Sequence, residues 1–169
     1  MDKPVVAAFD FDGTLTRHDT LFPFLLCVAG LAQFSYKILL LLPTLTGYAL
    51  GLIRNDKAKI NVLRCFLAMM DMDTLQQHAL KFAKTKLPAM LRAEAIERLE
   101  WHKRQGHRCV VVSASLENYL LPWASKAGFN DILSSRLETI EGKRTSGKLL
   151  GENCYGPSNV SKRRIFSGP

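Results

Sequence analysis

The chain has 169 residues, 47% of them hydrophobic, and a formal net charge of +8. This length favours a single domain with a substantial buried core. Its four cysteines are scattered without a Cys-x-x-Cys pair, which argues against a zinc site and favours a reducing compartment. No nucleic-acid motif accompanies the positive charge, so we expect phosphate-bearing substrates or an anionic membrane surface as partners, and no nucleic acid. The N-terminus leads straight into an apolar run, and we expect a cytoplasmic protein without a signal peptide.

The first predicted element is a short buried strand over residues 5–9, Val-Val-Ala-Ala-Phe. Asp10 and Asp12 follow at its carboxyl end, and Gly13 with Thr14 suits a tight turn. Ligands bind at the carboxyl ends of strands in open α/β sheets. A strand that ends in two acids therefore predicts a functional site in preference to a merely solvated strand end.

The segment from Asp10 to Thr16, Asp-Phe-Asp-Gly-Thr-Leu-Thr, resembles the first motif of the haloacid dehalogenase-like superfamily of phosphohydrolases. The continuation from Arg17 to Leu25 resembles its class IB branch, which includes phosphoserine phosphatase-like enzymes and a phosphatidylglycerophosphatase C-like group. This resemblance implies an α/β fold, with a Rossmann-like parallel sheet and a helical cap inserted after the first strand. We place the core at residues 1–19 and 105–169 and the cap at residues 20–104.

The resemblance also implies roles for the two acids. Asp10 would be both the nucleophile and a metal ligand. Asp12 would protonate the leaving oxygen and then activate water, and its main-chain carbonyl would contact the metal. A carboxylate can form an aspartyl-phosphate, but attack on a phosphate anion requires a cation, and Mg²⁺ prefers oxygen ligands. We expect an Mg²⁺-dependent phosphomonoester hydrolase, with a phosphotransferase as an alternative. Asp19 is interpreted as a helix N-terminal residue rather than a ligand.

The segment from Thr20 to Ile53 is strongly apolar, and Lys37 is its only charge. Neither uncharged half reaches the roughly 20 residues of a transmembrane helix. We expect two short helices in a hairpin, interrupted at Pro43, Gly47 and Gly51. A basic cluster follows, which consists of Arg54, Lys57 and Lys59.

Apolar segments flanked by cations are typical of contact with an anionic membrane. The segment from Thr20 to Ile53 therefore favours a location at the inner face of the cell membrane. It also favours a lipid phosphate such as phosphatidylglycerophosphate as substrate. The alternative interpretation is a cap that packs on itself and on the core, in which case a soluble phosphomonoester is the better candidate.

Residues 56–106 have helical periodicity, with Gly106 as a C-terminal cap. The apolar run 109–112 then predicts a central parallel strand, and Ser113 follows at its carboxyl end. This resembles the second superfamily motif, which makes Ser113 and Ala114 candidates for binding the phosphate. We expect Ser115 to cap the next helix. The alternative is that Ser113 and Ser115 are only capping residues.

Residues 132–149 predict a strand followed by a hairpin. The third superfamily motif requires a lysine, and we assign Lys162 in preference to Asn159, although Lys162 also suits a solvated basic helix face. The fourth motif is an acidic strand end, yet Glu152 is the last acid of the chain. We therefore expect a C-terminally truncated member of the superfamily. A non-catalytic membrane-associated protein is a further alternative.

Overall fold

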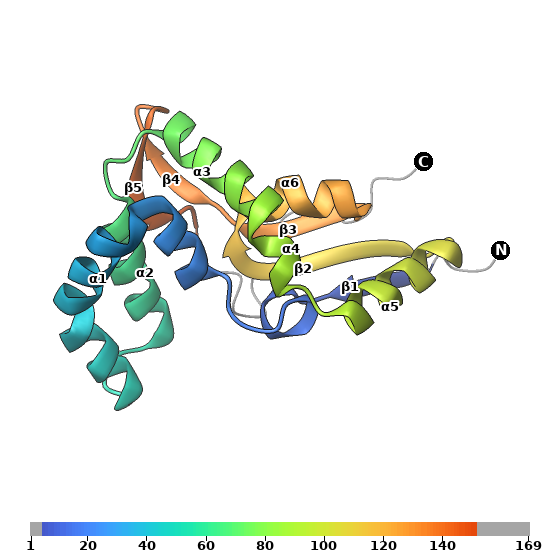
Figure 1. Ribbon diagram of the computed structural model, residues 1–169, viewed down its shortest axis with the longest axis horizontal. Helices are drawn as coiled ribbons and strands as arrows, with labels where there is room; N and C mark the ends of the chain where they lie inside the picture. The colour runs from blue at the N-terminus through green and yellow to red at the C-terminus, as the bar shows by residue number, and fades with distance from the viewer. Residues whose placement is uncertain (1–4, 152–169) are drawn as a thin grey trace.

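Parallel strands form the centre of the structure, a computed structural model that describes residues 5–151 (Figure 1). The strands of this sheet are β1 (Val6–Phe9), β2 (Arg108–Leu116) and β3 (Asp131–Ser135). Within the described range β2 lies between β1 and β3 and is parallel to both. Phe9 lies opposite Val111, so Asp10 and Ser113 follow at the same edge of the sheet. The expected parallel α/β fold is confirmed.

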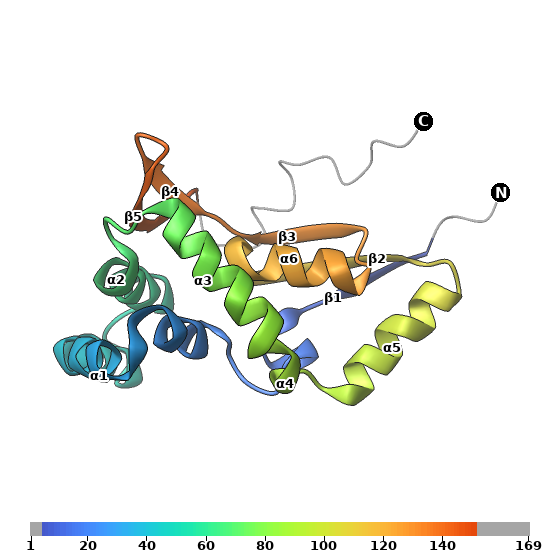
Figure 2. The ribbon, with the colours of Figure 1, turned by 45° about the horizontal axis from the view of Figure 1, so that its top comes forward.

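Helices cover the sheet and connect it to the cap (Figure 2). The helix α5 (Ala93–Arg104) packs on β2, and α6 (Glu117–Ala127) packs on β2 and β3. The helix α3 (Met72–Thr85) crosses α6 and leads through the short α4 (Leu87–Met90) to α5. Gly106 follows α5 with a φ of 70°, a value that favours glycine, and its predicted place at the helix end is confirmed.

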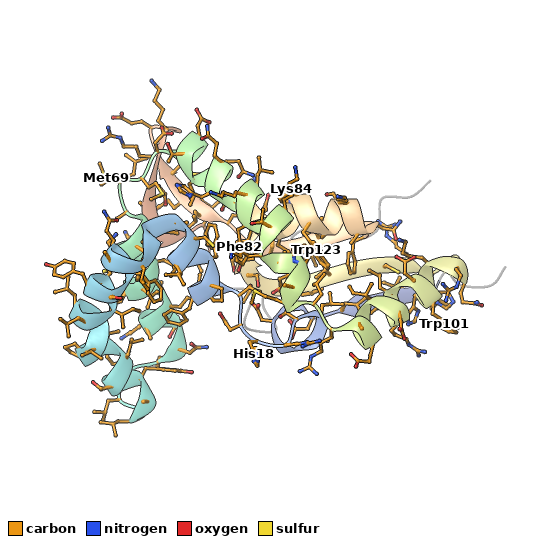
Figure 3. All side chains as sticks on the ribbon, in the orientation of Figure 1. His18, Met69, Phe82, Lys84, Trp101 and Trp123 are labelled. Carbon is orange, nitrogen blue, oxygen red and sulfur yellow. The ribbon has the colours of Figure 1, made fainter. Side chains whose placement is uncertain are left out.

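Aromatic side chains fill the space between α3, α6 and the sheet (Figure 3). Phe82 and Tyr119 are fully buried, and their ring centroids lie 5.3 Å apart. Phe24 from the start of the cap packs on both rings, with centroid distances of 5.5 and 4.9 Å. Trp123 is buried beside them, whereas Trp101 lies exposed on α5. This cluster joins the cap to the core just below the edge where β1 and β2 end.

The apolar part of the cap consists of α1 (Leu21–Ala49) and α2 (Asn55–Leu67), which pack against each other. The helical geometry of α1 breaks at Gly30, with φ 72° and ψ 165°. The predicted breaks at Pro43 and Gly47 are wrong, because both residues lie inside α1, whereas Gly51 follows the end of the helix with a φ of 73°. Glycine alone adopts the geometry of residue 30 without strain, whereas Pro43 lacks only its own donor. The Thr46 hydroxyl also bonds the carbonyls of Leu42 and Pro43, at 2.8 and 3.1 Å.

The predicted hairpin is confirmed as β4 (Leu137–Ile140) and β5 (Arg144–Leu149), which are antiparallel. It packs on α2, and Gly147 permits the close approach because a Cβ there would lie 2.6 Å from the Arg64 Cα. Backbone bonds also join Met69 and Met70 to Thr145, with N–O distances of 2.8 and 2.9 Å. The hairpin therefore holds the far end of α2 in place.

Candidate active site

The loop after β1 turns sharply so that Asp10 faces outward from the sheet edge. It forms a one-turn π-helical segment, η1 (Phe11–Leu15), in which Gly13 has a φ of 78°. The Asp10 carboxylate accepts the Phe11 N–H at 2.8 Å and the Thr14 hydroxyl at 3.2 Å. Asp10 is exposed, because the loop leaves the carboxylate at the rim of a cavity. The two bonds fix its orientation while one side stays open to a ligand.

Asp12 is held more tightly and lies deeper. One carboxylate oxygen accepts the backbone N–H of Thr20 at 2.9 Å and the Thr20 hydroxyl at 2.7 Å, and the other accepts the Ser115 hydroxyl. Burial raises the pKa of Asp12 above its ordinary value, although the bonds from Ser115 and Thr20 oppose the shift. A carboxyl group that keeps its proton more readily than usual suits proton donation.

A buried hydroxyl chain supports Asp12 from behind. The Tyr119 hydroxyl lies 2.9 Å from the Thr20 hydroxyl, and both residues are fully buried. Thr20 donates to Asp12, so Tyr119 donates to Thr20. Burial and the nearby Asp12 carboxylate hold the pKa of Tyr119 well above its usual range. Tyr119 therefore remains a neutral donor, and the chain fixes where the Asp12 carboxylate points.

Ser113 and Ser115 stand inside β2 rather than at a helix end. β2 continues to Leu116, and α6 begins at Glu117 without a side-chain cap. The Ser113 hydroxyl donates to the Ser115 hydroxyl at 3.1 Å and accepts the Ser115 N–H at 3.0 Å. The prediction that Ser115 caps α6 is wrong, as is the alternative that both serines only cap. The extension of β2 keeps the serines in the strand, where Ser115 bonds Asp12 instead.

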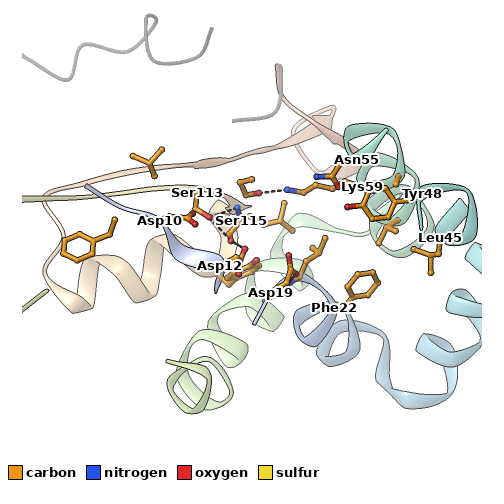
Figure 4. A pocket seen from close by; sticks show the side chains of 18 of the residues that line it. Asp10, Asp12, Asp19, Phe22, Leu45, Tyr48, Asn55, Lys59, Ser113 and Ser115 are labelled. Atoms are coloured by element: carbon orange, nitrogen blue, oxygen red, sulfur yellow. Dashed lines mark hydrogen bonds between the residues drawn. The ribbon is translucent and has the colours of Figure 1, made fainter. Parts of the chain in front are cut away.

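These residues meet around one cavity of about 630 Å³ (Figure 4). Asp10, Asp12 and Ser113 form its polar wall at the sheet edge. The opposite wall comes from the cap, through apolar residues of α1 and polar residues of α2. This wall includes Phe22, Leu45, Tyr48, Asn55 and Lys59. The cavity therefore joins an exposed carboxylate to a largely apolar lining.

Residues 7–165 match the family model of the haloacid dehalogenase-like hydrolases. The chain belongs to this family. The curated protein CicA of Caulobacter vibrioides (strain NA1000 / CB15N) is 32% identical to it over 167 residues, which cover 99% of this chain and 74% of CicA. The superfamily expected from the first motif is thus confirmed.

Solved structures share the same fold. A protein of unknown function from Bordetella pertussis Tohama I has a TM-score of 0.74 and 21% identity, and the match covers 90% of this chain and 69% of that one. A substrate-bound phosphoserine phosphatase has a TM-score of 0.58 and 19% identity, with 90% and 65% covered. A phosphoserine phosphohydrolase-like protein from Francisella tularensis subsp. tularensis SCHU S4 has a TM-score of 0.62 and 17% identity, with 87% and 64% covered. These likenesses show a shared fold, a parallel α/β core with a helical cap.

Lys59 is a site residue that the sequence analysis assigned to a different surface. Its ammonium group donates to the Ala114 carbonyl at 2.6 Å, and the residue lines the cavity instead of facing outward with Arg54. Asn55, Lys59 and Val62 recur at helical spacing and all line the cavity, a signal that could have revealed this face of α2. Lys59 therefore brings a cation from the cap to Ala114 near the end of β2.

The remaining predicted positions have different outcomes. Asp19 accepts the Leu21 N–H at 2.8 Å, as expected of a residue at a helix start, and it also lines the cavity. Lys162 and Asn159 lie outside the described residues.

Residues 5–151 contain no group of three or more acids, histidines or cysteines placed to hold a metal. Asp10 and Asp12 nevertheless offer the hard oxygen donors that Mg²⁺ prefers, and Mg²⁺ is usually held by one or two carboxylates together with a phosphate.

Proposed function

We propose that this chain is an Mg²⁺-dependent phosphomonoester hydrolase that acts through an aspartyl-phosphate at Asp10. The observation that carries this proposal is the pairing of an exposed carboxylate with a partly buried one at the same cavity. Asp10 is oriented by two hydrogen bonds yet exposed, whereas Asp12 has a raised pKa and three hydrogen bonds. These environments suit a nucleophile and a proton donor, respectively.

In the proposed reaction, an oxygen of Asp10 bonds to phosphorus while the bond from phosphorus to the leaving oxygen breaks. Asp12 gives its proton to that leaving oxygen. Water then attacks the phosphorus, Asp12 takes a proton from the water, and the Asp10 carboxylate is released with inorganic phosphate. Thr20 and Ser115 keep the Asp12 carboxylate in one orientation through both steps. The roles of Asp10 and Asp12 follow the family resemblance, and the observed hydrogen bonds support them.

The Asp10 carboxylate and the main-chain carbonyl of Asp12 would hold Mg²⁺, which would neutralise charge on the phosphate. We assign phosphate binding to Ser113 and Ala114 at the end of β2, and to Lys162 in the third motif. In this proposal, residues 1–19 and 105–169 form the α/β core of the protein, and residues 20–104 form the cap. Membership of the class IB branch belongs to the same proposal.

The lining of the cavity favours an amphiphilic phosphomonoester over a small polar one. Phe22, Leu45 and Tyr48 extend from α1 into the wall opposite Asp10. The α1 part of this wall offers phosphoserine few polar partners, whereas a lipid phosphate such as phosphatidylglycerophosphate would place its glyceryl or acyl portion against it. We propose that the protein works at the cytoplasmic face of an anionic membrane.

Turnover of an aryl phosphate and of a short-chain phosphatidylglycerophosphate, each with and without Mg²⁺, tests the proposal. We expect Mg²⁺-dependent phosphate release from both, with the lipid preferred. Mass spectrometry after an acid quench should find a phosphoryl group on the peptide that contains Asp10. An Asp73→Asn variant, altered at an exposed acid on α3, serves as a matched control. Turnover without phosphorylated protein would contradict the aspartyl-phosphate mechanism.

A further inference from the structure

The outer side of α1 is an apolar surface that no other described element covers. We define the outer face of α1 by Leu31, Tyr36, Leu39 and Leu40, whose exposed fractions are 75%, 63%, 62% and 57%. Leu50 and Leu52 continue it into the following turn and are 74% and 79% exposed. Figure 1 shows α1 at one end of the structure, away from the sheet. The face contains no charged residue, which is unusual for a surface that meets only water.

The inner side of the same helix packs on α2 over part of its length. Leu41 is only 6% exposed, and the Phe34 ring packs on Phe66 of α2 with centroids 5.4 Å apart. Lys37, the only charge in the segment, turns inward, where its ammonium group donates to the Phe66 carbonyl at 3.4 Å and lies 5.2 Å from that ring. Helix α1 is therefore apolar on two faces, one packed on α2 and one facing outward.

By length and composition alone, α1 could cross a membrane. Its contacts favour a different arrangement, because a spanning helix would have to leave α2 and carry Lys37 into the bilayer. Gly30 also divides α1, so its 29 residues do not form one continuous helix. A helix packed on one side and apolar on the other instead suits the plane between headgroups and acyl chains.

We propose that the outer face of α1 lies in the headgroup–acyl boundary of an anionic bilayer, as a peripheral contact that does not span the membrane. Charge selects this occupant over a second copy of the chain. Arg54, two residues after Leu52, has an 81% exposed side chain paired with Asp56 at 3.3 Å, and Lys57 is exposed one turn later, so this edge of the face keeps a net positive charge. In a self-paired arrangement these cations would repel across the contact, whereas anionic headgroups neutralise them.

The surface is continuous with the cavity. Leu45 and Tyr48 lie on α1 and line the cavity that holds Asp10 (Figure 4). Bound in this way, α1 brings the apolar wall of the cavity next to the bilayer, so that a lipid phosphate reaches Asp10 without fully leaving the membrane. This last step rests on the proposed hydrolysis at Asp10, whereas the contact specifies the membrane location proposed above and does not depend on the chemistry.

Vesicle flotation tests the membrane contact of α1 separately from the proposed hydrolysis at Asp10. We expect the chain to float with phosphatidylglycerol-containing vesicles and much less with phosphatidylcholine vesicles. A Leu39→Ser/Leu40→Ser variant should lose binding by roughly tenfold to a hundredfold, because both side chains sit on the outer face. A Leu80→Ser/Leu121→Ser variant is the matched control, since those leucines are also exposed, at 48% and 42%, but lie on α3 and α6. Arg54→Gln and Lys57→Gln should each reduce binding to anionic vesicles about fivefold.

Activity in the same variants distinguishes the membrane contact from the chemistry. The Leu39→Ser/Leu40→Ser variant should hydrolyse a soluble aryl phosphate normally but lose turnover of vesicle-borne lipid phosphate. Flotation without any turnover would sustain the contact and contradict the proposed function. Absence of flotation with both lipids, or a lipid-free dimer that Leu39→Ser/Leu40→Ser dissociates, would overturn the contact. If the protein stays with the vesicles after carbonate extraction, the contact is not peripheral.

Discussion

The sheet edge and the α1–α2 hairpin line the same cavity, but different interactions stabilise them. At the sheet edge, Asp12 accepts hydrogen bonds from Thr20 and Ser115, and Thr20 is bonded in turn by Tyr119. Helices α1 and α2 are held together by apolar contacts such as Phe34 on Phe66, and the outer face of α1 is exposed. Directional hydrogen bonds fix the Asp12 carboxylate, whereas apolar packing fixes one side of α1 and leaves its outer side exposed.

This contrast predicts where substitutions act. Changes at the sheet edge should alter the chemical step and leave membrane binding unchanged. Changes on the outer face of α1 should do the reverse.

Asp10→Asn should abolish hydrolysis, with turnover reduced by roughly 10⁴-fold or more, because an amide does not attack phosphorus. The amide oxygen can still accept the Phe11 N–H, so the loop should keep its shape. Aryl phosphate turnover with Mg²⁺ and mass spectrometry for phosphorylated protein measure the effect, and circular dichroism checks the fold. Turnover near that of the unchanged chain would exclude Asp10 as the nucleophile.

Asp12→Asn should reduce turnover by about 10²- to 10⁴-fold through loss of proton transfer, while stabilising the metal-free protein at neutral pH. Burial raises the pKa of Asp12 in the folded state above its unfolded value. The contribution of Asp12 to stability is therefore full at low pH and is lost as pH rises through the folded pKa. Asparagine never ionises and avoids this loss.

The stability part of the Asp12→Asn prediction is measured by thermal unfolding in a chelator across a range of pH. The melting temperature of the variant should exceed that of the unchanged chain at pH 7. The difference should shrink below about pH 4, near the ordinary aspartic acid pKa, where both side chains are neutral. A variant that melts lower at pH 7 would show that burial does not dominate the environment of Asp12.

Much of the sheet edge could be predicted from the sequence, because its signals are local. A short apolar run followed by two acids located the end of β1, and Ser113 followed the apolar run of β2 in the same way. Ser115 was misassigned, since a local capping preference was outweighed by the pairing of Leu116 with Ser135, which extends β2. The break in α1 was misplaced because proline and glycine are both helix breakers, yet Pro43 and Gly47 stay helical and only Gly30 has a positive φ inside α1.

The contacts that orient Asp12 could not be predicted, because they are made in three dimensions. Thr20 and Tyr119 are 99 residues apart in the chain, and no local pattern links them. Lys59 was grouped with Arg54 and Lys57 as a charge run, but helix α2 turns Lys59 towards Ala114. Assigning such residues requires knowing which helix face meets the cavity.

Lys59→Met tests whether a cap residue can act at the sheet edge. Loss of the ammonium group should raise the KM for an aryl phosphate by roughly tenfold to a hundredfold, the range expected for a charged hydrogen-bonding group. Lys57→Met is the matched control, because Lys57 is exposed on the same helix and does not line the cavity. Equal effects of the two substitutions would indicate that only the overall charge matters.

Thr20→Val should have a smaller effect that reports on the buried hydroxyl chain. Valine keeps the shape and the backbone bond to Asp12, but it removes the Thr20 hydroxyl from the buried Tyr119 hydroxyl, which keeps only the interaction with Ser115. Loss of this buried hydrogen bond should cost about 1–3 kcal/mol of unfolding free energy, whereas Tyr119→Phe, which removes the hydroxyl itself, should cost about 0.5–1.5 kcal/mol.

Because both substitutions break the same bond, the Thr20→Val/Tyr119→Phe double variant should lose less than the sum of the two single changes. Denaturant unfolding of the four proteins gives this coupling energy. Additive losses would mean that Tyr119 and Thr20 act separately. The orientation of Asp12 would then depend on Ser115 and the Thr20 backbone alone, and Tyr119→Phe should leave aryl phosphate turnover unchanged. A true coupling should instead be accompanied by a reduced kcat in both single variants, since each loosens the residue that positions the proton donor.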